Sequence, residues 1–248
     1  MAPLSIGSLM LYKYIGSEDS QKVLRNLKRF VEDGTISASA PSSFNDPSEF
    51  KVSITMGGTE VERRKHFEDN GCKDFSFEDW DAVAPEAAKS LAVDLRKESL
   101  GAFGVVCLSP NEDNILMWSH YSVSHKGFCI GFDDDFVTSI EGYHSFDNVK
   151  YIPSVPVFDE VTDEFKVLFD KLFFYKHECW KYEEEQRVIT KKIGAQAFDK
   201  KYIREIILGH NVSPEVEEYA RTQLDTSIEV YKMSTPDDGY LLVKEKLK

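Results

Sequence analysis

The sequence predicts a single α+β domain, built on a central, mostly antiparallel sheet that is split or curved and has flanking helices. Strand-like segments with alternating apolar and polar residues occur near both ends of the chain. Helical segments with apolar residues three and four positions apart lie between them, and no repeat or low-complexity linker divides the 248 residues. Since 42% of the residues are hydrophobic and 12% aromatic, a sizeable core can form.

The N-terminal part begins with a predicted strand at residues 9–16, where apolar and polar residues alternate. Residues 19–33 then switch to helical spacing, and Gly34 follows the expected helix end. A short strand is expected at residues 35–40.

The stretch "SSFNDPSEF", residues 42–50, predicts a short helix or a turn. Asp46 is a natural N-cap, Pro47 suits the first helical position, and Glu49 stands at the third, as in a capping box. A polar turn made rigid by proline would equally present Asn45 and Asp46 to a ligand, so both roles stay open.

The middle and C-terminal parts continue the mixed pattern. Residues 55–100 are charged and favour helix, which predicts a helical insertion covering one side of the sheet. Further strands are expected at residues 101–109, 128–132, 185–190, 203–209, 228–233 and 239–246, and further helices at residues 112–127, 164–176 and 213–224.

Charge and cysteine usage exclude several classes of protein. The net charge of −13 argues against broad adhesion to nucleic-acid backbones or anionic lipid. No apolar stretch approaches the roughly 20 residues of a membrane span, and no leader pattern is present, so we expect a cytoplasmic protein without a membrane partner. The four cysteines form no Cys-x-x-Cys pair, which predicts reduced thiols rather than zinc ligands or disulfides.

A first candidate site lies at the end of the helix expected over residues 112–127. It gathers side chains that can bond or stack on a planar ligand: Trp118, Ser119, His120, Tyr121, His125 and Lys126. Because His120 and His125 are five residues apart, they do not share a helical face, and we expect no metal. Alternatively, His125 and Lys126 contact the helix's last carbonyl groups.

A second candidate site is "WKYEEEQRVIT", residues 180–190. The strand period of two puts Glu183, Glu185 and Arg187 on one face. The opposite face would carry Tyr182, Glu184 and Gln186. A solvated ladder of ion pairs is the alternative, but the bracketing aromatics and the apolar strand favour a site.

The motifs "LYKY", "FNDPSE", "CLS", "MWSHYSVSHKGFCIGF" and "WKYEEEQRVI", followed by "IREIILG", resemble the signature of a large bacterial family, domain of unknown function family 2971. The resemblance runs from Leu11 to about Gly209 and leaves out residues 55–100.

More distantly, the layout is similar to ADP-ribosyltransferase-like toxins and effectors. That resemblance implies an enzyme that cleaves NAD, a nucleotide-type substrate, at the nicotinamide–ribose bond. It would act in toxin or antiphage defence biology, with a protein or nucleic-acid acceptor. The early strand would contribute Lys13 or Tyr14, the middle of the chain Ser109 or Tyr121, and the late strand Glu185. Lys13 stands where those enzymes have Arg or His.

The same resemblance implies a role for each of the two glutamates. Glu185 would stabilise an oxocarbenium-like transition state, and Glu183 would accept a proton from the nucleophile. The expected catalytic residues are Glu185, Glu183, His120 and Tyr121, and the expected NAD-binding residues are Lys13, Tyr14, Asn45, Asp46, Ser109, Trp118, Ser119, His125, Lys126 and Arg187.

Two other functions stay open. A metal-independent nucleotide or phosphodiester hydrolase would use His120 and His125 as acid and base, with Lys126 and Arg187 on phosphate. A non-catalytic nucleotide-sensing or protein-interaction module would bind with the same side chains without turnover.

Overall fold

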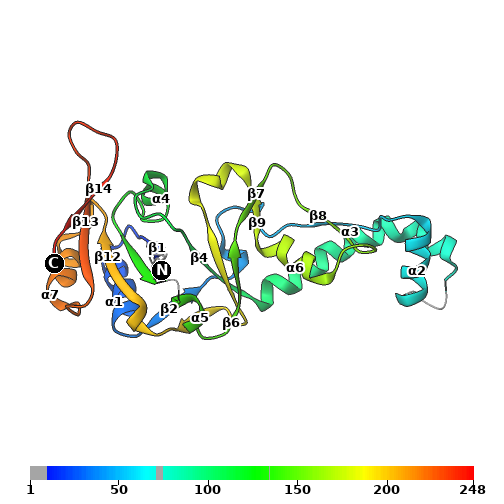
Figure 1. The fold of residues 1–248 in the computed structure, drawn as a ribbon, viewed down its shortest axis with the longest axis horizontal. Coiled ribbons are helices and arrows are strands. Elements are labelled where there is room, and N and C mark those ends of the chain that lie inside the picture. Colours follow the sequence, from blue (N-terminus) through cyan, green and yellow to red (C-terminus); the bar gives the residue numbers. More distant parts are fainter. Residues whose placement is uncertain (1–9, 71–74, 134) are drawn as a thin grey trace, which may run out of the picture. The chain divides into compact units, whose positions relative to one another are not determined.

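The computed structural model describes residues 10–70, 75–133 and 135–248 and confirms an α+β fold (Figure 1). The chain divides into two compact units, described separately below. Unit 1 contains residues up to Ala38, Val105–Asn148 and Lys181–Lys248, and unit 2 contains Ser39–Gly104 and Val149–Trp180. The single-domain expectation stays a prediction. None of the described helices combines the length and hydropathy that a bilayer crossing requires.

The larger sheet of unit 1 has five strands in the order β1-β5-β12-β13-β14. They are β1 (Met10–Ile15), β5 (Phe128–Asp133), β12 (Ile203–Leu208), β13 (Glu229–Ser234) and β14 (Val243–Lys246). Only the β12–β13 pair is parallel. The prediction of a mostly antiparallel sheet is therefore confirmed.

Two helices of unit 1, α1 (Ser20–Val31) and α7 (Pro214–Gln223), lie against this sheet (Figure 1). The side chain of Asp19 caps α1 by accepting a hydrogen bond from the Gln21 N–H group. The core between helices and sheet is rich in phenylalanine and includes Phe30, Phe128, Phe132, Phe136 and Phe198, of which Phe136 belongs to the short α5 (Phe136–Ser139).

Unit 1 also contains two small sheets, so its strands are split as predicted. One has the order β4-β10-β6, and in the other β2 pairs with β11. Their strands are β4 (Gly104–Leu108), β10 (Gln186–Thr190), β6 (Tyr143–Asn148), β2 (Thr35–Ala38) and β11 (Gly194–Ala197). Sequence reasoning missed β6 and β11, because each is largely polar or small and carries no apolar alternation.

The helix expected over residues 112–127 is wrong in length. Helix α4 spans only Ile115–His120, and a left-handed turn follows in which Val123, Ser124 and His125 have φ angles of 51°, 55° and 62°. Such angles are uncommon outside glycine and unfavourable for β-branched valine. The Ser122 hydroxyl donates a hydrogen bond to the Trp118 carbonyl inside this segment.

Three glycines let the backbone approach this turn closely. A Cβ atom at Gly16 would lie 2.2 Å from the Ser122 carbonyl carbon, and one at Gly127 would lie 1.8 Å from the Ile15 carbonyl oxygen. One at Gly209 would lie 2.2 Å from the His125 carbonyl oxygen. These glycines follow β1, precede β5 and follow β12, so they meet at one edge of the five-stranded sheet.

Unit 2 is built from helices and two pairs of parallel strands, β3 with β8 and β7 with β9. Helices α2 and α3 lie largely in the segment predicted to be helical. Helix α6 lies within the range 164–176 expected to be helical, and the residues after it form β9. The elements are η1 (Pro41–Ser43), β3 (Ser53–Thr55), α2 (Glu60–Asn70), α3 (Phe77–Ala102), β7 (Lys150–Ile152), β8 (Val157–Asp159), α6 (Phe165–Phe173) and β9 (Tyr175–His177). The 3₁₀ helix η2 (Glu178–Glu183) begins in unit 2 and ends in unit 1, and η3 (Lys200–Tyr202) belongs to unit 1.

The stretch "FNDPSE" forms a turn rather than a helix. The Asp46 carboxylate accepts hydrogen bonds from the Ser48 N–H group at 2.7 Å and the Ser48 hydroxyl at 2.5 Å. The capping-box role expected of Glu49 is wrong, because this side chain is buried and its carboxylate lies 3.2 Å from the Lys176 ammonium.

We predict that Gly127→Ala lowers the free energy of unfolding by about 3 kcal/mol or more, since its methyl group would overlap the Ile15 carbonyl oxygen. Gly101→Ala is the matched control. Its Cβ atom would meet nothing within 4 Å, and its place in α3 predicts a gain of up to about 1 kcal/mol. Urea denaturation measures both, and equal effects would contradict the close approach.

Candidate functional site

The three consecutive glutamates differ in environment. Glu183 is 2% exposed, Glu185 is 3% exposed and Arg187 is fully buried. Glu184 is exposed and has a φ angle of 44°, so the backbone turns it away from its neighbours. The burial of Glu183, Glu185 and Arg187 excludes the solvated ladder. Their shared strand face stays a prediction, because Glu183 ends the 3₁₀ helix η2 and β10 begins only at Gln186.

Glu183 joins the two candidate segments. Its carboxylate accepts a hydrogen bond of 2.5 Å from the hydroxyl of Tyr121, which is partly exposed. The buried hydroxyl of Ser109 donates to the Glu183 carbonyl oxygen at 2.9 Å and fixes the backbone there. Tyr121, Ser109 and Glu183 therefore meet, as the sequence analysis expected of a site.

Glu185 and Arg187 form a buried bidentate pair. The Arg187 Nε and Nη2 atoms lie 2.8 and 3.0 Å from the two carboxylate oxygens of Glu185. This planar contact fixes the orientation of both groups in a medium where charge interactions are strong. Burial raises the pKa of the neighbouring Cys107 thiol, and the Glu185 carboxylate raises it further, so this thiol is neutral.

Lys13 reaches the same region, since its Nζ atom donates to the Cys107 carbonyl oxygen at 3.2 Å. Tyr14 points elsewhere. Its hydroxyl donates to the Asn111 carbonyl oxygen at 2.7 Å, and its pKa is raised mainly by burial. Of the two residues expected from the early strand, Lys13 is the one beside the charged pair.

Trp118 is fully buried and cannot offer a ring face to a ligand in this conformation. Its indole N–H group donates to the Glu112 carbonyl oxygen at 2.7 Å. The Tyr14 ring packs edge-on at 5.3 Å, and the His125 ring stacks at 6.0 Å with an interplanar angle of 9°. Trp118 thus supports the left-handed turn.

The two histidines have different partners. His120 is exposed, and its Nδ1 atom lies 3.0 Å from the Tyr182 hydroxyl, while the Asn114 amide fixes the Tyr182 carbonyl oxygen at 2.6 Å. The Nδ1 atom of His125 is buried and has no hydrogen-bond partner among the described residues. Within those residues no group of three or more metal-binding side chains occurs.

The remaining predicted residues are engaged elsewhere. The Ser119 hydroxyl donates to the Ile115 carbonyl oxygen in its own helix, and Lys126 pairs with Glu18 at the surface. Asn45 and Asp46 belong to unit 2, where Asn45 is exposed and the Asp46 carboxylate accepts a hydrogen bond of 2.7 Å from the Trp180 indole.

Sequence reasoning missed Cys107, Asn114 and the left-handed turn. Asn114 could have been found as an N-cap, since its side chain accepts hydrogen bonds from Leu116 and Met117, the pattern that asparagine favours before a helix. No sequence rule identifies the turn, because Val123, Ser124 and His125 rarely adopt positive φ angles.

The comparison with family models finds one that covers residues 117–188 and is described as "Protein of unknown function (DUF2971)". This segment contains Tyr121, Glu183, Glu185 and Arg187, and the match confirms the predicted family resemblance. No curated protein and no solved structure matches the chain.

We predict that Arg187→Met lowers the free energy of unfolding by about 3–5 kcal/mol, because it leaves the buried Glu185 carboxylate without its guanidinium. The double variant, Glu185→Met with Arg187→Met, should lose less free energy of unfolding than the sum of the losses in the two single variants. Glu184→Gln, an exposed neighbour, should change stability by no more than about 0.5 kcal/mol. Urea denaturation tests all four proteins, and additive losses would contradict the coupling.

We also predict a pH effect from His125. Burial lowers the pKa of its imidazole in the folded state, and nearby His210 lowers it further. Below the unfolded-state pKa of about 6.5, the unfolded chain binds a proton that the folded chain resists, so this contribution is present at higher pH and lost as pH falls. Wild type should lose more stability than His125→Gln between roughly pH 7.5 and 5.5. Parallel thermal denaturation curves would contradict this.

Proposed function

We propose that this chain, whose residues 117–188 belong to the DUF2971 family, is an ADP-ribosyltransferase-like enzyme that cleaves the nicotinamide–ribose bond of NAD. One observation carries the proposal. Two carboxylates two residues apart, Glu183 and Glu185, are both buried, and the first is bonded to Tyr121 while the second is held by Arg187.

The electrostatics favour a transition state with positive charge. Breaking the glycosidic bond develops an oxocarbenium-like ribose, which carboxylates stabilise strongly where water is excluded. The charges of Glu183, Glu185 and Arg187 sum to −1, and the Lys13 ammonium lies in the same region. An NAD ribose that contacts Tyr121, the partly exposed partner of Glu183, would be stabilised as it becomes cationic.

Each carboxylate has its own role in the proposal. Glu185, which is buried and held by Arg187, acts on the ribose through its negative charge. Glu183 takes a proton, either directly or through the hydroxyl of the partly exposed Tyr121.

The reaction balances with a nucleophile as the other substrate. The C–N bond breaks, nicotinamide leaves with the bonding electron pair, and an oxygen or nitrogen nucleophile bonds to the ribose C1′ and gives its proton to Glu183. The nucleophile is water in glycohydrolysis, or a protein or nucleic-acid side group in transfer. Toxin or antiphage defence biology and a cytoplasmic location are part of this proposal.

The pyrophosphate needs a cation. We assign it to Lys126, whose surface pair with Glu18 contributes little and can exchange for phosphate. The Arg187 guanidinium is instead committed to Glu185. Trp118 and Tyr14 act as supports for His125 and the turn.

We predict that the protein releases nicotinamide from NAD and that Glu185→Gln and Glu183→Gln each lower the rate about 100-fold or more, because each removes a charge that acts in the transition state. Nicotinamide is measured by chromatography. Glu184→Gln, the same change at the exposed neighbour, is the control and should keep wild-type activity. Thermal denaturation curves confirm that each variant is folded.

Other results would favour the rival functions. Nucleotide or phosphodiester hydrolysis that depends on His120 and His125 would replace the proposal with a hydrolase, although the two imidazoles pack on different aromatic rings. Stabilisation by nucleotides without any product would favour a sensing module. No nicotinamide release from wild type would contradict the proposed activity.

A further inference from the structure

Unit 2 contains an open groove of about 390 Å³ that the proposed NAD site does not use. Its apolar lining comes from Val52 and Ile54 on the β3 side, Ala92 and Val93 on α3, and Val155. This volume lies within the range of small-molecule sites, which are about 300–1,000 Å³ and mostly apolar. The groove can therefore bury the apolar body of a small ligand.

The charged residues of the groove are all cations. Lys51, Lys89 and Arg96 line it, and none of its lining residues is acidic. The positions of Lys89, Ala92, Val93 and Arg96 follow the spacing of one helical face. Lys89 is paired with Glu86 at 2.9 Å, so Lys51 and Arg96 are the cations that make the groove complementary to an anion in a protein of net charge −13.

Glu49 organises two cations of unit 2. Its backbone carbonyl oxygen accepts a hydrogen bond of 3.2 Å from the Arg96 guanidinium, and its buried carboxylate lies 3.2 Å from the Lys176 ammonium. The Arg96 Nε atom is buried and has no hydrogen-bond partner among the described residues. Since a guanidinium has five donors, Arg96 retains capacity for an anionic oxygen.

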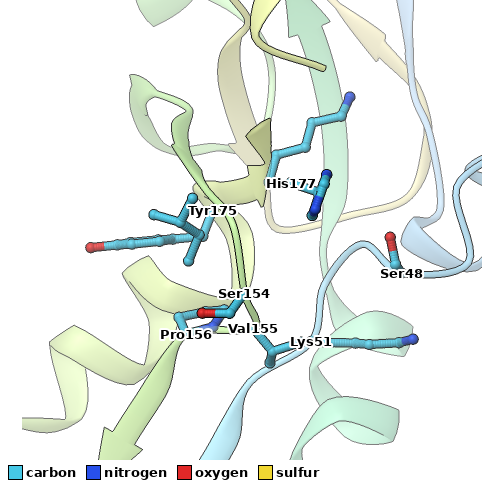
Figure 2. Close-up of a pocket in the computed structure, with 9 residues that line it drawn as sticks. Ser48, Lys51, Ser154, Val155, Pro156, Tyr175 and His177 are labelled. Carbon is cyan, nitrogen blue, oxygen red and sulfur yellow. The ribbon is translucent and has the colours of Figure 1, made fainter. Parts of the chain in front are cut away.

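Lys51 connects this groove to a second cavity. A cavity of about 60 Å³, lined in part by Ser48, Tyr175 and His177, shares Lys51 and Val155 with the groove. Figure 2 shows Lys51 and Val155 next to one another, with His177 and Ser48 on the same side of the loop that carries Val155. Among the described residues Lys51 has no ion-pair partner, so its charge is available to a ligand.

We propose that this groove binds a small amphipathic anion, with its phosphate or carboxylate head at Lys51 and Arg96 and its apolar body along Val52, Ile54 and Val155. Charge-assisted hydrogen bonds to the cations fix the head group, and apolar burial contributes the remaining affinity. This site is independent of the nicotinamide chemistry proposed for unit 1.

Decyl phosphate and decanoate, each below its micelle concentration, are the probes, and calorimetric titration of the full chain is the measurement. Both probes should bind. The probe with the higher affinity shows whether the site prefers a phosphate or a carboxylate head group. Decanol, which has the same apolar chain without the charge, should bind at least about tenfold more weakly. Equal binding of decanol, or no binding of either anion, would overturn the proposal.

Variants locate the binding. Lys51→Gln should weaken the anions about tenfold, and Val155→Asp should weaken them at least as much, because it puts a carboxylate where both cavities meet. Two exposed residues outside the groove provide the matched controls. They are Lys97→Gln on α3 and Val61→Asp on α2, and both variants should bind the anions like wild type. Equal weakening by the controls would overturn the assignment to this groove.

Discussion

The buried pair of Glu185 and Arg187 constrains the centre of unit 1. Removing two charges from water costs several kcal/mol each, and only a planar bidentate contact with further polar neighbours offsets that cost. The pair therefore fixes the start of β10, and with it the position of Glu183, two residues before Glu185. Glu183 in turn holds the Tyr121 hydroxyl. The geometry of the candidate site thus depends on the ion pair between Glu185 and Arg187.

The left-handed turn at residues 123–125 is the second constraint, and its backbone conformation costs free energy. Positive φ angles at Val123 and His125 are unfavourable, and such strain persists only where surrounding structure enforces it. Here the enforcement comes from Gly16, Gly127 and Gly209, which bring three strand ends against the turn. Trp118 completes the support by stacking on His125. Strain of this kind concentrates at functional sites, which agrees with the site proposed beside it.

The two proposed sites differ in the charge of the residues that form them. The proposed NAD site contains two buried carboxylates, whereas the charged residues that line the groove of unit 2 are cations. The turn of the motif "FNDPSE" serves the second site through Glu49, which holds Arg96 and Lys176. Asp46 of the same motif accepts a hydrogen bond from Trp180, three residues before Glu183 in the chain.

The sequence by itself determined the α+β class and the antiparallel sheet, because these follow from a local period of two or 3.6 residues. It did not show that Glu183 ends a 3₁₀ helix before β10 begins. The likeness to ADP-ribosyltransferase-like enzymes suggested Ser109 or Tyr121 as a further site residue, and both contact Glu183 in the structure. Only the tertiary structure decided that α4 ends at His120, that Trp118 is buried and that Glu49 pairs with Lys176. Each of these depends on contacts between residues far apart in sequence, such as the approach of Gly209 to His125, which no local pattern encodes.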